Sequence, residues 1–206
     1  KGTPLDPRTV PLTDEGRTQA DAANEMLVEV KFDLAVCSGL VRTEETARRV
    51  LGARALDLAV ERGFLEVRAG RLREVPVEQR EAVVGHAYDG AEQPGARFIG
   101  GEAWGGFQAR VLAAWQDWVR RDFDTLLLVA HDAVNRVILA HCCGAGLAGL
   151  SAFEQDPCCV NIIDVDVAEG EVIRSLVRAA GLAPYNLAKH GDRRTVMERI
   201  HDSYRG

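Results

Sequence analysis

Residues 125–143, with the sequence TLLLVAHDAVNRVILAHCC, change at His131 from one pattern to another. The stretch from Thr125 to Ala130 is short and continuously apolar, which is typical of a strand buried on both faces of a parallel sheet. From Asp132 onward apolar residues recur at helical spacing, and Asp132 has the side-chain chemistry of a helix N-cap. The pattern predicts a strand, then His131, then a helix. His131 is thereby placed at a sheet edge where α/β proteins bind ligands and helix N-termini favour anions.

The rest of the chain repeats this alternation, which predicts an α/β fold with a mainly parallel sheet. Its 206 residues suit a single domain, 1–206, that includes a polar C-terminal tail over 182–206. We expect this tail to be a solvated terminal helix; the alternatives are that it folds over the mouth of a site or packs on a neighbouring subunit. The expected strands lie near 33–37, near 57–60 and in CCVNIIDVDV, with an antiparallel partner for the last across a Glu169-Gly170 turn. The expected helices begin after Thr13, run from about Thr43 to Gly52, occupy 71–84 with a break at Pro76, and fill FQARVLAAWQDWVRRD.

Composition and motifs exclude several classes of function. The formal net charge is -6 and no basic tract is present, so nucleic acid is not an expected partner. No apolar run reaches transmembrane length, so no membrane partner is expected either. The five cysteines are odd in number and lack C-x-x-C spacing, which indicates reduced thiols in a cytoplasmic protein. Without a P-loop, G-x-G-x-x-G or H-E-x-x-H pattern, no metal and no cofactor is predicted.

A second strand end, LAVCSGLVRTEETARRV, resembles the first. It places Ser38 and Arg42 at the same carboxyl edge as His131, where an arginine fork suits phosphate oxygens. Glu66 follows the next strand and could exchange protons there if its pKa is raised. Simpler readings stay open: Ser38 as a helix cap, Arg42 as a surface partner of Glu44 or Glu45, and Glu66 as a solvated loop residue.

Several segments, in this order, resemble the histidine phosphatase superfamily, also called phosphoglycerate mutase-like. Their order and spacing agree over roughly residues 9–165, and Asn161 falls near a late family asparagine. The resemblance implies a three-layer α/β sandwich with a mainly parallel central sheet flanked by helices. The segments are VPLTDEGRTQA, SGLVRTEETA, FLEVRAG, GGEAW and LLLVAHDAVNRVIL.

The resemblance also implies a mechanism. Family members attack a phosphomonoester with a histidine of an R-H-G or R-H-A motif, form a phosphohistidine, and use no metal. By this resemblance Arg42, Ser38 and the backbone of Asp132 bind the phosphate. His131 stabilises the phosphoryl group during transfer, and Glu66 donates a proton to the leaving oxygen. The expected substrate is a small phosphorylated metabolite.

The sequence departs from the family at two points. No histidine lies on a strand ahead of PLT, so we expect the first strand and its nucleophilic histidine upstream of residue 1. Asp132 replaces the family glycine after the histidine, and its carboxylate would repel a phosphate. We favour the interpretation that this side chain turns back to cap the helix.

The loop over 85–106 is rich in glycine and aromatic residues, and loops of this length often bind ligands. We expect His86 and Arg97 to face the substrate, and Phe98 and Trp104 to anchor the loop to the core. Its moderate length favours a phosphatase over a mutase. Alternatives are mutase-type phosphoryl transfer, an inactive module that binds or senses phosphate esters, and a protein-interaction role through a homodimer.

Overall fold

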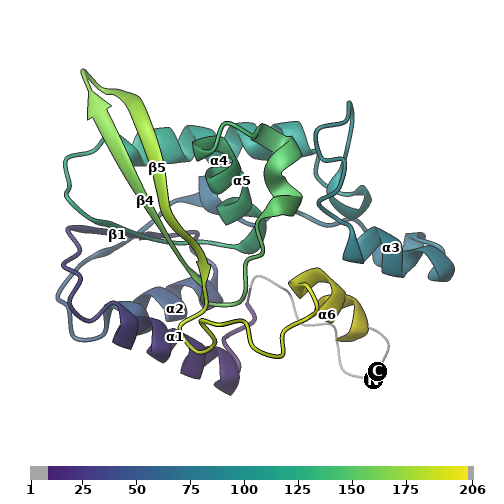
Figure 1. The fold of residues 1–206 in the computed structure, drawn as a ribbon, viewed down its shortest axis with the longest axis horizontal. Helices are drawn as coiled ribbons and strands as arrows, with labels where there is room; N and C mark the ends of the chain where they lie inside the picture. Colours follow the sequence, from purple (N-terminus) through teal and green to yellow (C-terminus); the bar gives the residue numbers. More distant parts are fainter. Residues whose placement is uncertain (1–8, 204–206) are drawn as a thin grey trace.

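A computed structural model describes residues 9–203 of the chain (Figure 1). Helices and strands alternate along most of this range, as the sequence predicts, and single 3-10 turns connect some of them. The strands are β1 (Leu34–Cys37), β2 (Leu58–Val60), β3 (Leu126–Val129), β4 (Val160–Ala168) and β5 (Glu171–Leu182). The α-helices are α1 (Asp14–Met26), α2 (Val41–Leu51), α3 (Arg80–Gly85), α4 (Trp104–Val119), α5 (Asp132–Cys142) and α6 (Val196–Ser203). The 3-10 turns are η1 (Arg62–Phe64), η2 (Leu72–Glu74), η3 (Val77–Gln79), η4 (Phe98–Gly100) and η5 (Gly146–Ala152).

The central sheet is parallel and has the strand order β2-β1-β3. Val36 in the middle of β1 pairs with Ala59 of β2 and Leu128 of β3. Helices α1 and α2 lie on one side of this sheet, and α4 and α5 lie on the other (Figure 1). The predicted α/β architecture, a parallel sheet flanked by helices, is therefore confirmed.

The alternation of side chains along β1 separates two hydrophobic cores. Val36 points into the larger core, where it meets aromatic and aliphatic residues of α4 and α5. Ala35 points into the smaller core and meets Ala23 of α1 and Leu51 of α2. Strand β1 therefore packs against both helix layers, one on each face of the sheet.

Strand β3 is less buried than its apolar sequence predicts. Leu127 is buried, but Leu126, Leu128 and Val129 are only half-buried. The reason is topological, because within residues 9–203 β3 pairs with β1 alone and lies at the edge of the sheet. Both faces of β3 are covered, as expected, because Leu126 and Leu128 pack on the larger core while Leu127 and Val129 pack on the smaller one; the partial exposure comes from the open edge of the strand within the described residues.

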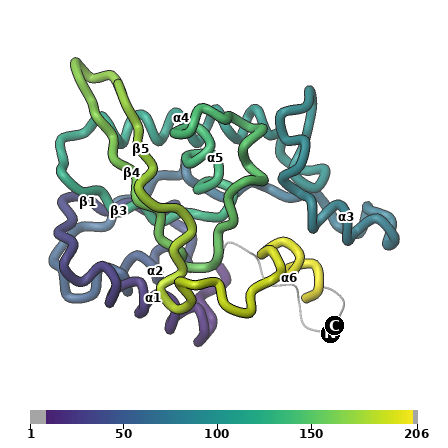
Figure 2. Tube along the Cα trace, viewed as in Figure 1, coloured from purple at the N-terminus to yellow at the C-terminus, as the bar shows by residue number. Residues whose placement is uncertain are grey.

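Strands β4 and β5 form a separate antiparallel hairpin, which is confirmed as predicted. Its turn has Glu169 at φ 52° and Gly170 at φ 77°, the left-handed pair that suits a tight two-residue hairpin turn. The hairpin packs on the larger core through Ile163, Val165 and Val172. Figure 2 shows the trace of the hairpin running beside α5.

Two predicted helices differ from the structure. Over 71–84, only the last part forms α3, while η2 and η3 replace the rest around Pro76. The tail contains α6, which packs against α3 and buries Met197 and His201, so it is more than a solvated terminal helix. Among the residues that the structure describes, no helix combines the length and apolarity needed to cross a bilayer.

Candidate active site

His131 occupies the predicted junction between β3 and α5. It is the N-cap residue of α5, with extended backbone, and is 8% exposed. Its Nδ1 atom lies 3.3 Å from Nη2 of Arg42, and its Nε2 atom lies 2.8 Å from Oγ of Ser38. A guanidinium can only donate, so Nδ1 is the acceptor and Nε2 carries the proton of the neutral ring.

A chain of hydroxyl groups continues from Nε2 of His131. Ser38 Oγ lies 3.0 Å from Thr43 Oγ1, and the Thr43 hydroxyl donates to the carbonyl of Leu40 at 2.8 Å. Since the Thr43 proton is used for Leu40, Ser38 receives the proton of His131 and donates its own to Thr43. Ser38 is therefore not a helix cap: α2 begins after Leu40, and Ser38 fixes the imidazole instead.

Arg42 points to His131 from the first turn of α2. Of the two glutamates considered as its surface partners, Glu45 accepts instead from Nε of Arg17 at 2.7 Å and also pairs with Arg49. Burial and the Arg42 charge lower the pKa of His131 to about 3. The imidazole is thus neutral at physiological pH, and the guanidinium is the positive group of the site.

Glu66 closes the site from the loop after β2. Its Oε1 accepts from the N–H of Val67 at 2.9 Å, and its Oε2 lies 3.4 Å from the N–H of Ala133 in the first turn of α5. Burial and the neighbouring Asp132 carboxylate raise the pKa of Glu66 to about 7, against the pull of Arg42. A carboxyl that holds its proton near neutral pH has the property required of a general acid.

Asp132 does not cap α5, and that interpretation is wrong. It is the first residue inside the helix, and its Oδ1 accepts from Nε of Arg136 at 2.6 Å. Its Oδ2 accepts from the hydroxyl of Tyr88 at 2.9 Å. The side chain of His131 makes no cap either, so no N-cap side chain engages the N–H groups of the first turn. Such a helix N-terminus favours an anion.

Arg110 and Glu102 hold the loop that carries Glu66. Arg110 Nη1 donates to the carbonyls of Gly63 at 2.8 Å and Leu65 at 2.9 Å, while its Nη2 lies 3.2 Å from Oε1 of Glu102. The N–H of Arg68 in turn donates to Oε2 of Glu102 at 3.1 Å. The backbone is therefore bound on both sides of Glu66.

The predicted substrate-loop residues are not brought into this cluster. His86 Nδ1 lies 3.0 Å from Asp89, and the exposed Arg97 donates to the carbonyl of Gly101 at 2.8 Å. Phe98 and Trp104 do anchor the loop, because they pack with Tyr88 and Phe107 in the larger core. Substrate contact by His86 and Arg97 stays a prediction.

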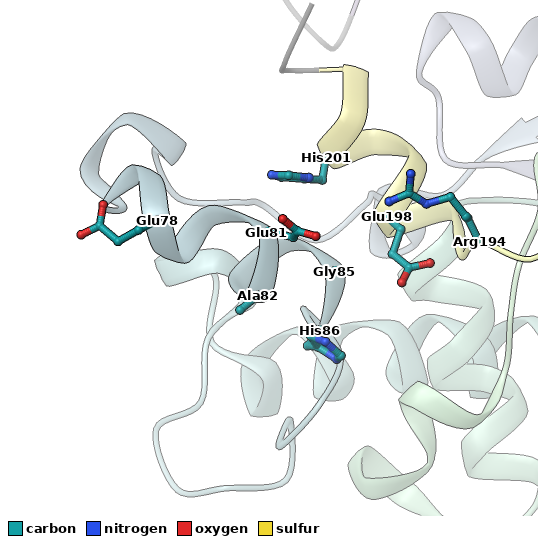
Figure 3. Close-up of a pocket in the computed structure, with 8 residues that line it drawn as sticks. All are labelled: Glu78, Glu81, Ala82, Gly85, His86, Arg194, Glu198 and His201. Carbon is teal, nitrogen blue, oxygen red and sulfur yellow. The ribbon is translucent and has the colours of Figure 1, made fainter.

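His86 instead borders a cavity of about 340 Å³ between α3 and α6 (Figure 3). Glutamates and histidines dominate its lining, and none of the residues around His131 takes part. Among residues 9–203, no group of three or more His, Cys, Asp and Glu side chains has an arrangement that could hold a metal ion. The lining residues are Glu78, Glu81, Ala82, Gly85, His86, Arg194, Glu198 and His201.

Sequence reasoning missed four residues that shape the site: Thr43, Arg110, Glu102 and Arg136. One had a local signal, because Arg136 follows Asp132 by four residues in an otherwise apolar helix, the spacing of a helical ion pair. Thr43 acts locally, on Ser38 and Leu40, and was expected only as the start of a helix. Arg110 and Glu102 reach the Glu66 loop across long sequence separations, and no local pattern indicates them.

Comparison with known proteins adds a family. A model described as the histidine phosphatase superfamily (branch 1) matches residues 6–178. The chain is 26% identical over 159 residues to a probable 2-carboxy-D-arabinitol-1-phosphatase of Arabidopsis thaliana, a match that covers 74% of this chain and 32% of that protein. It is 27% identical over 161 residues to the adenosylcobalamin/alpha-ribazole phosphatase of Escherichia coli K12, covering 76% and 78%.

Solved structures agree with this assignment. The alpha-ribazole phosphatase of Shigella flexneri superimposes with a TM-score of 0.65 and 25% identity, covering 84% of this chain and 85% of that chain. The chain spans about a third of the length of the plant relatives that it matches.

Proposed function

The chain belongs to the histidine phosphatase superfamily, and on that premise we propose that it hydrolyses the phosphomonoester of a small phosphorylated metabolite. The observation that carries the proposal is the group formed by Arg42, His131 and Glu66 at one edge of the parallel sheet. The relatives named above are themselves named as phosphatases, which supports this class of reaction.

The phosphate binds, in this proposal, between Arg42 and the N-terminus of α5. The guanidinium of Arg42 moves from Nδ1 of His131 and donates to two phosphate oxygens, and the backbone N–H of Asp132 donates to a third. Ser38 keeps the imidazole in place from behind, at 2.8 Å from Nε2. The dianion then lies beside Nδ1 of His131, where a protonated ring can stabilise the charge of the phosphoryl group during transfer.

Glu66 is the proton donor to the leaving oxygen. It is held at the first turn of α5, and its pKa of about 7 keeps much of it protonated at neutral pH. A protonated donor is needed because the leaving alkoxide is a strong base, and its expulsion becomes easier when the proton arrives with bond cleavage.

We assign the attacking nucleophile to a histidine on a strand upstream of residue 1, so that a phosphohistidine forms and water then hydrolyses it without a metal. The sheet supports a further strand at this point. The outer edge of β3 has no strand partner within residues 9–203, and Leu126 and Leu128 are half-buried beside it. The cytoplasmic location and a homodimer stay predictions.

The test is a phosphomonoester panel assayed with the full-length gene product. We expect Arg42→Ala and His131→Ala each to lower kcat/KM by roughly a hundredfold or more, as for lost charge stabilisation in other active sites. Arg174→Ala, on the exposed face of the β4–β5 hairpin, is the matched control and leaves turnover unchanged.

Two other outcomes are informative. Full turnover by either site variant would refute the assigned roles. Tight binding of phosphorylated ligands with no turnover of any ester would refute the hydrolase and favour the binding module. Glu66→Gln separates the proton donor from a structural role, because it slows esters with poor leaving groups most, whereas a structural role slows all esters equally.

A further inference from the structure

Asp132 places a carboxylate at the helix N-terminus where the proposed phosphate binds. Both of its oxygens are used, Oδ1 by Arg136 at 2.6 Å and Oδ2 by the Tyr88 hydroxyl at 2.9 Å. Its side chain is 17% exposed. A free carboxylate so close to a phosphate would lower the affinity for that phosphate by roughly tenfold or more, given the effective dielectric near a protein surface.

Arg136 is the buried cation that forms an ion pair with the Asp132 carboxylate. It is 2% exposed, and every part of its guanidinium is held. Nε binds Asp132, Nη1 donates to the carbonyl of Leu150 at 3.0 Å, and Nη2 lies 3.2 Å from Oε2 of Glu154. The guanidinium carbon also lies 4.1 Å from the centre of the Tyr88 ring.

A buried pair of this kind is weak evidence for stability, because removing two charges from water costs about as much as their attraction returns. Its position is more informative. The pair lies on the first and second turns of α5, at the end of the helix where the phosphate is proposed to bind. Glu66 reaches the same turn, because its Oε2 lies 3.4 Å from the N–H of Ala133, next to Asp132.

The carboxyl of Glu66 faces charged or titratable groups from three elements. Asp132 approaches from α5, Arg42 from α2 and Tyr88 from the loop after α3, while His131 lies at the same end of α5. Of these, Asp132 is the group whose negative charge favours the protonated form of Glu66. The same charge opposes phosphate binding unless a cation compensates it.

We propose that Asp132 and Arg136 act as one positioning pair: Asp132 sets the charge beside the neighbouring proton donor Glu66, and Arg136 neutralises Asp132 toward the phosphate. The inference rests on the proposed function, since it concerns the phosphate site and the proton donor of that reaction. It explains how a carboxylate can occupy the residue after His131 without closing the site to anions.

The experiment measures binding of inorganic phosphate by calorimetry to the full-length protein and to the variants Asp132→Asn, Arg136→Met and the double variant. Arg136→Met alone weakens phosphate binding by about tenfold or more, because Asp132 is left uncompensated. The double variant returns the affinity to within about threefold of the unsubstituted protein. Arg174→Met, which breaks the exposed Asp166–Arg174 pair, is the matched control and changes nothing.

Asp132→Asn alone tests the other half of the proposal. It keeps a hydrogen-bonding group of the same shape, leaves or strengthens phosphate binding, and shifts the alkaline limb of the kcat–pH profile to lower pH. A double variant that binds phosphate as weakly as Arg136→Met would refute the compensation. An unmoved alkaline limb in Asp132→Asn would refute the effect on Glu66.

Failure of the proposed function would give different results from failure of the Asp132–Arg136 pair alone. If the unsubstituted protein binds no phosphate, the phosphate site and the pair are refuted together. If it binds phosphate and Arg42→Ala abolishes binding, the site stands, and the variants above decide the pair alone. Arg136→Lys, which keeps the charge, replaces Arg136→Met if the latter does not fold, and it should retain most of the affinity.

Discussion

Arg110 reaches the carbonyl of Leu65, the residue before Glu66, at 2.9 Å, and the same guanidinium meets Glu102, which binds the N–H of Arg68 on the other side. The carboxyl of Glu66 is therefore positioned by an ion pair that does not touch it. A shift of about 1 Å in a catalytic group can cost around a hundredfold in rate, so this pair matters if Glu66 donates a proton.

We expect Arg110→Met to lower kcat by about ten- to a hundredfold with little change in KM, because the donor moves while Arg42 stays in place. Arg110→Lys should recover only part of the rate, since an ammonium cannot span two carbonyls and a carboxylate. Arg120→Met, which breaks an exposed pair with Glu171, is the control. A large rise in KM with kcat unchanged would contradict the prediction.

Gly101 allows the turn before α4 to lie against the Glu66 loop. A Cβ atom on Gly101 would lie 2.1 Å from the carbonyl oxygen of Arg68 and 2.4 Å from the N–H nitrogen of Gly70. Gly101→Ala should therefore destabilise the fold by about 2 kcal/mol or more and lower kcat. Gly105→Ala, whose Cβ would meet open space within α4, should be neutral or stabilise by up to about 1 kcal/mol. Thermal unfolding of both variants measures the contrast.

Glu66 and His131 make opposite contributions to the pH dependence of stability. The pKa of His131 is about 3 rather than 6.5, so the unfolded chain binds an extra proton between these values and the contribution is lost as pH falls. The pKa of Glu66 is about 7 rather than 4.5, so the folded chain holds the extra proton and its contribution is lost as pH rises. Between pH 4.5 and 6.5 the two slopes cancel.

Single variants should reveal the two slopes. In Glu66→Gln only the contribution of His131 to the pH dependence of stability remains. The free energy of unfolding of this variant therefore falls by about 1.4 kcal/mol per pH unit on acidification below pH 6.5. His131→Asn leaves the Glu66 slope, so its stability falls as pH rises toward 7. Urea unfolding at several pH values measures both, relative to the unsubstituted protein. Parallel pH curves for all three proteins would show that these pKa shifts are absent.

Phosphate binding should take up protons. A dianion beside Nδ1 of His131, with Arg42 turned away, favours the second proton on a ring whose pKa is about 3 in the free site. Calorimetry at one pH in buffers of different ionisation enthalpy gives the number of protons taken up. Glu66→Gln removes the contribution of the nearby carboxyl, and a value of zero in that variant would contradict a charged His131 in the complex.

Most of the candidate site could be predicted from the two junctions at which a strand is followed by a helix. Ser38, Arg42 and His131 were placed at one sheet edge because parallel strands end together, and the structure brings them into contact. The fate of Asp132 could not be predicted, because a helix-capping hydroxyl or carboxyl and an i,i+4 ion pair use the same side chain. The helix begins one residue earlier than a cap at Asp132 requires, and Arg136 decides the outcome.

Arg110 and Glu102 escaped prediction for a different reason. Each contact joins segments tens of residues apart, such as Arg110 with Gly63 and Glu102 with Arg68, and depends on the packed fold instead of a local pattern. His86 was expected beside the substrate because it opens a glycine-rich loop, and that contact stays a prediction; at the C-terminal end of α3 it borders the cavity shared with α6. Packing of Tyr88, Phe98 and Trp104 fixes where that loop can go.

The chain of hydroxyl groups at Nε2 of His131 has a consequence for proton transfer to and from the ring. From Nε2 the hydrogen bonds run through Ser38 and Thr43 and end at the backbone carbonyl of Leu40, which cannot pass a proton on. Ser38 is 1% exposed and Thr43 is 3% exposed, so water has little access to any link. The Nε2 proton should therefore exchange slowly with solvent and give a visible imidazole N–H resonance. Protons that enter or leave the ring during turnover must pass on its Nδ1 side, where Arg42 lies.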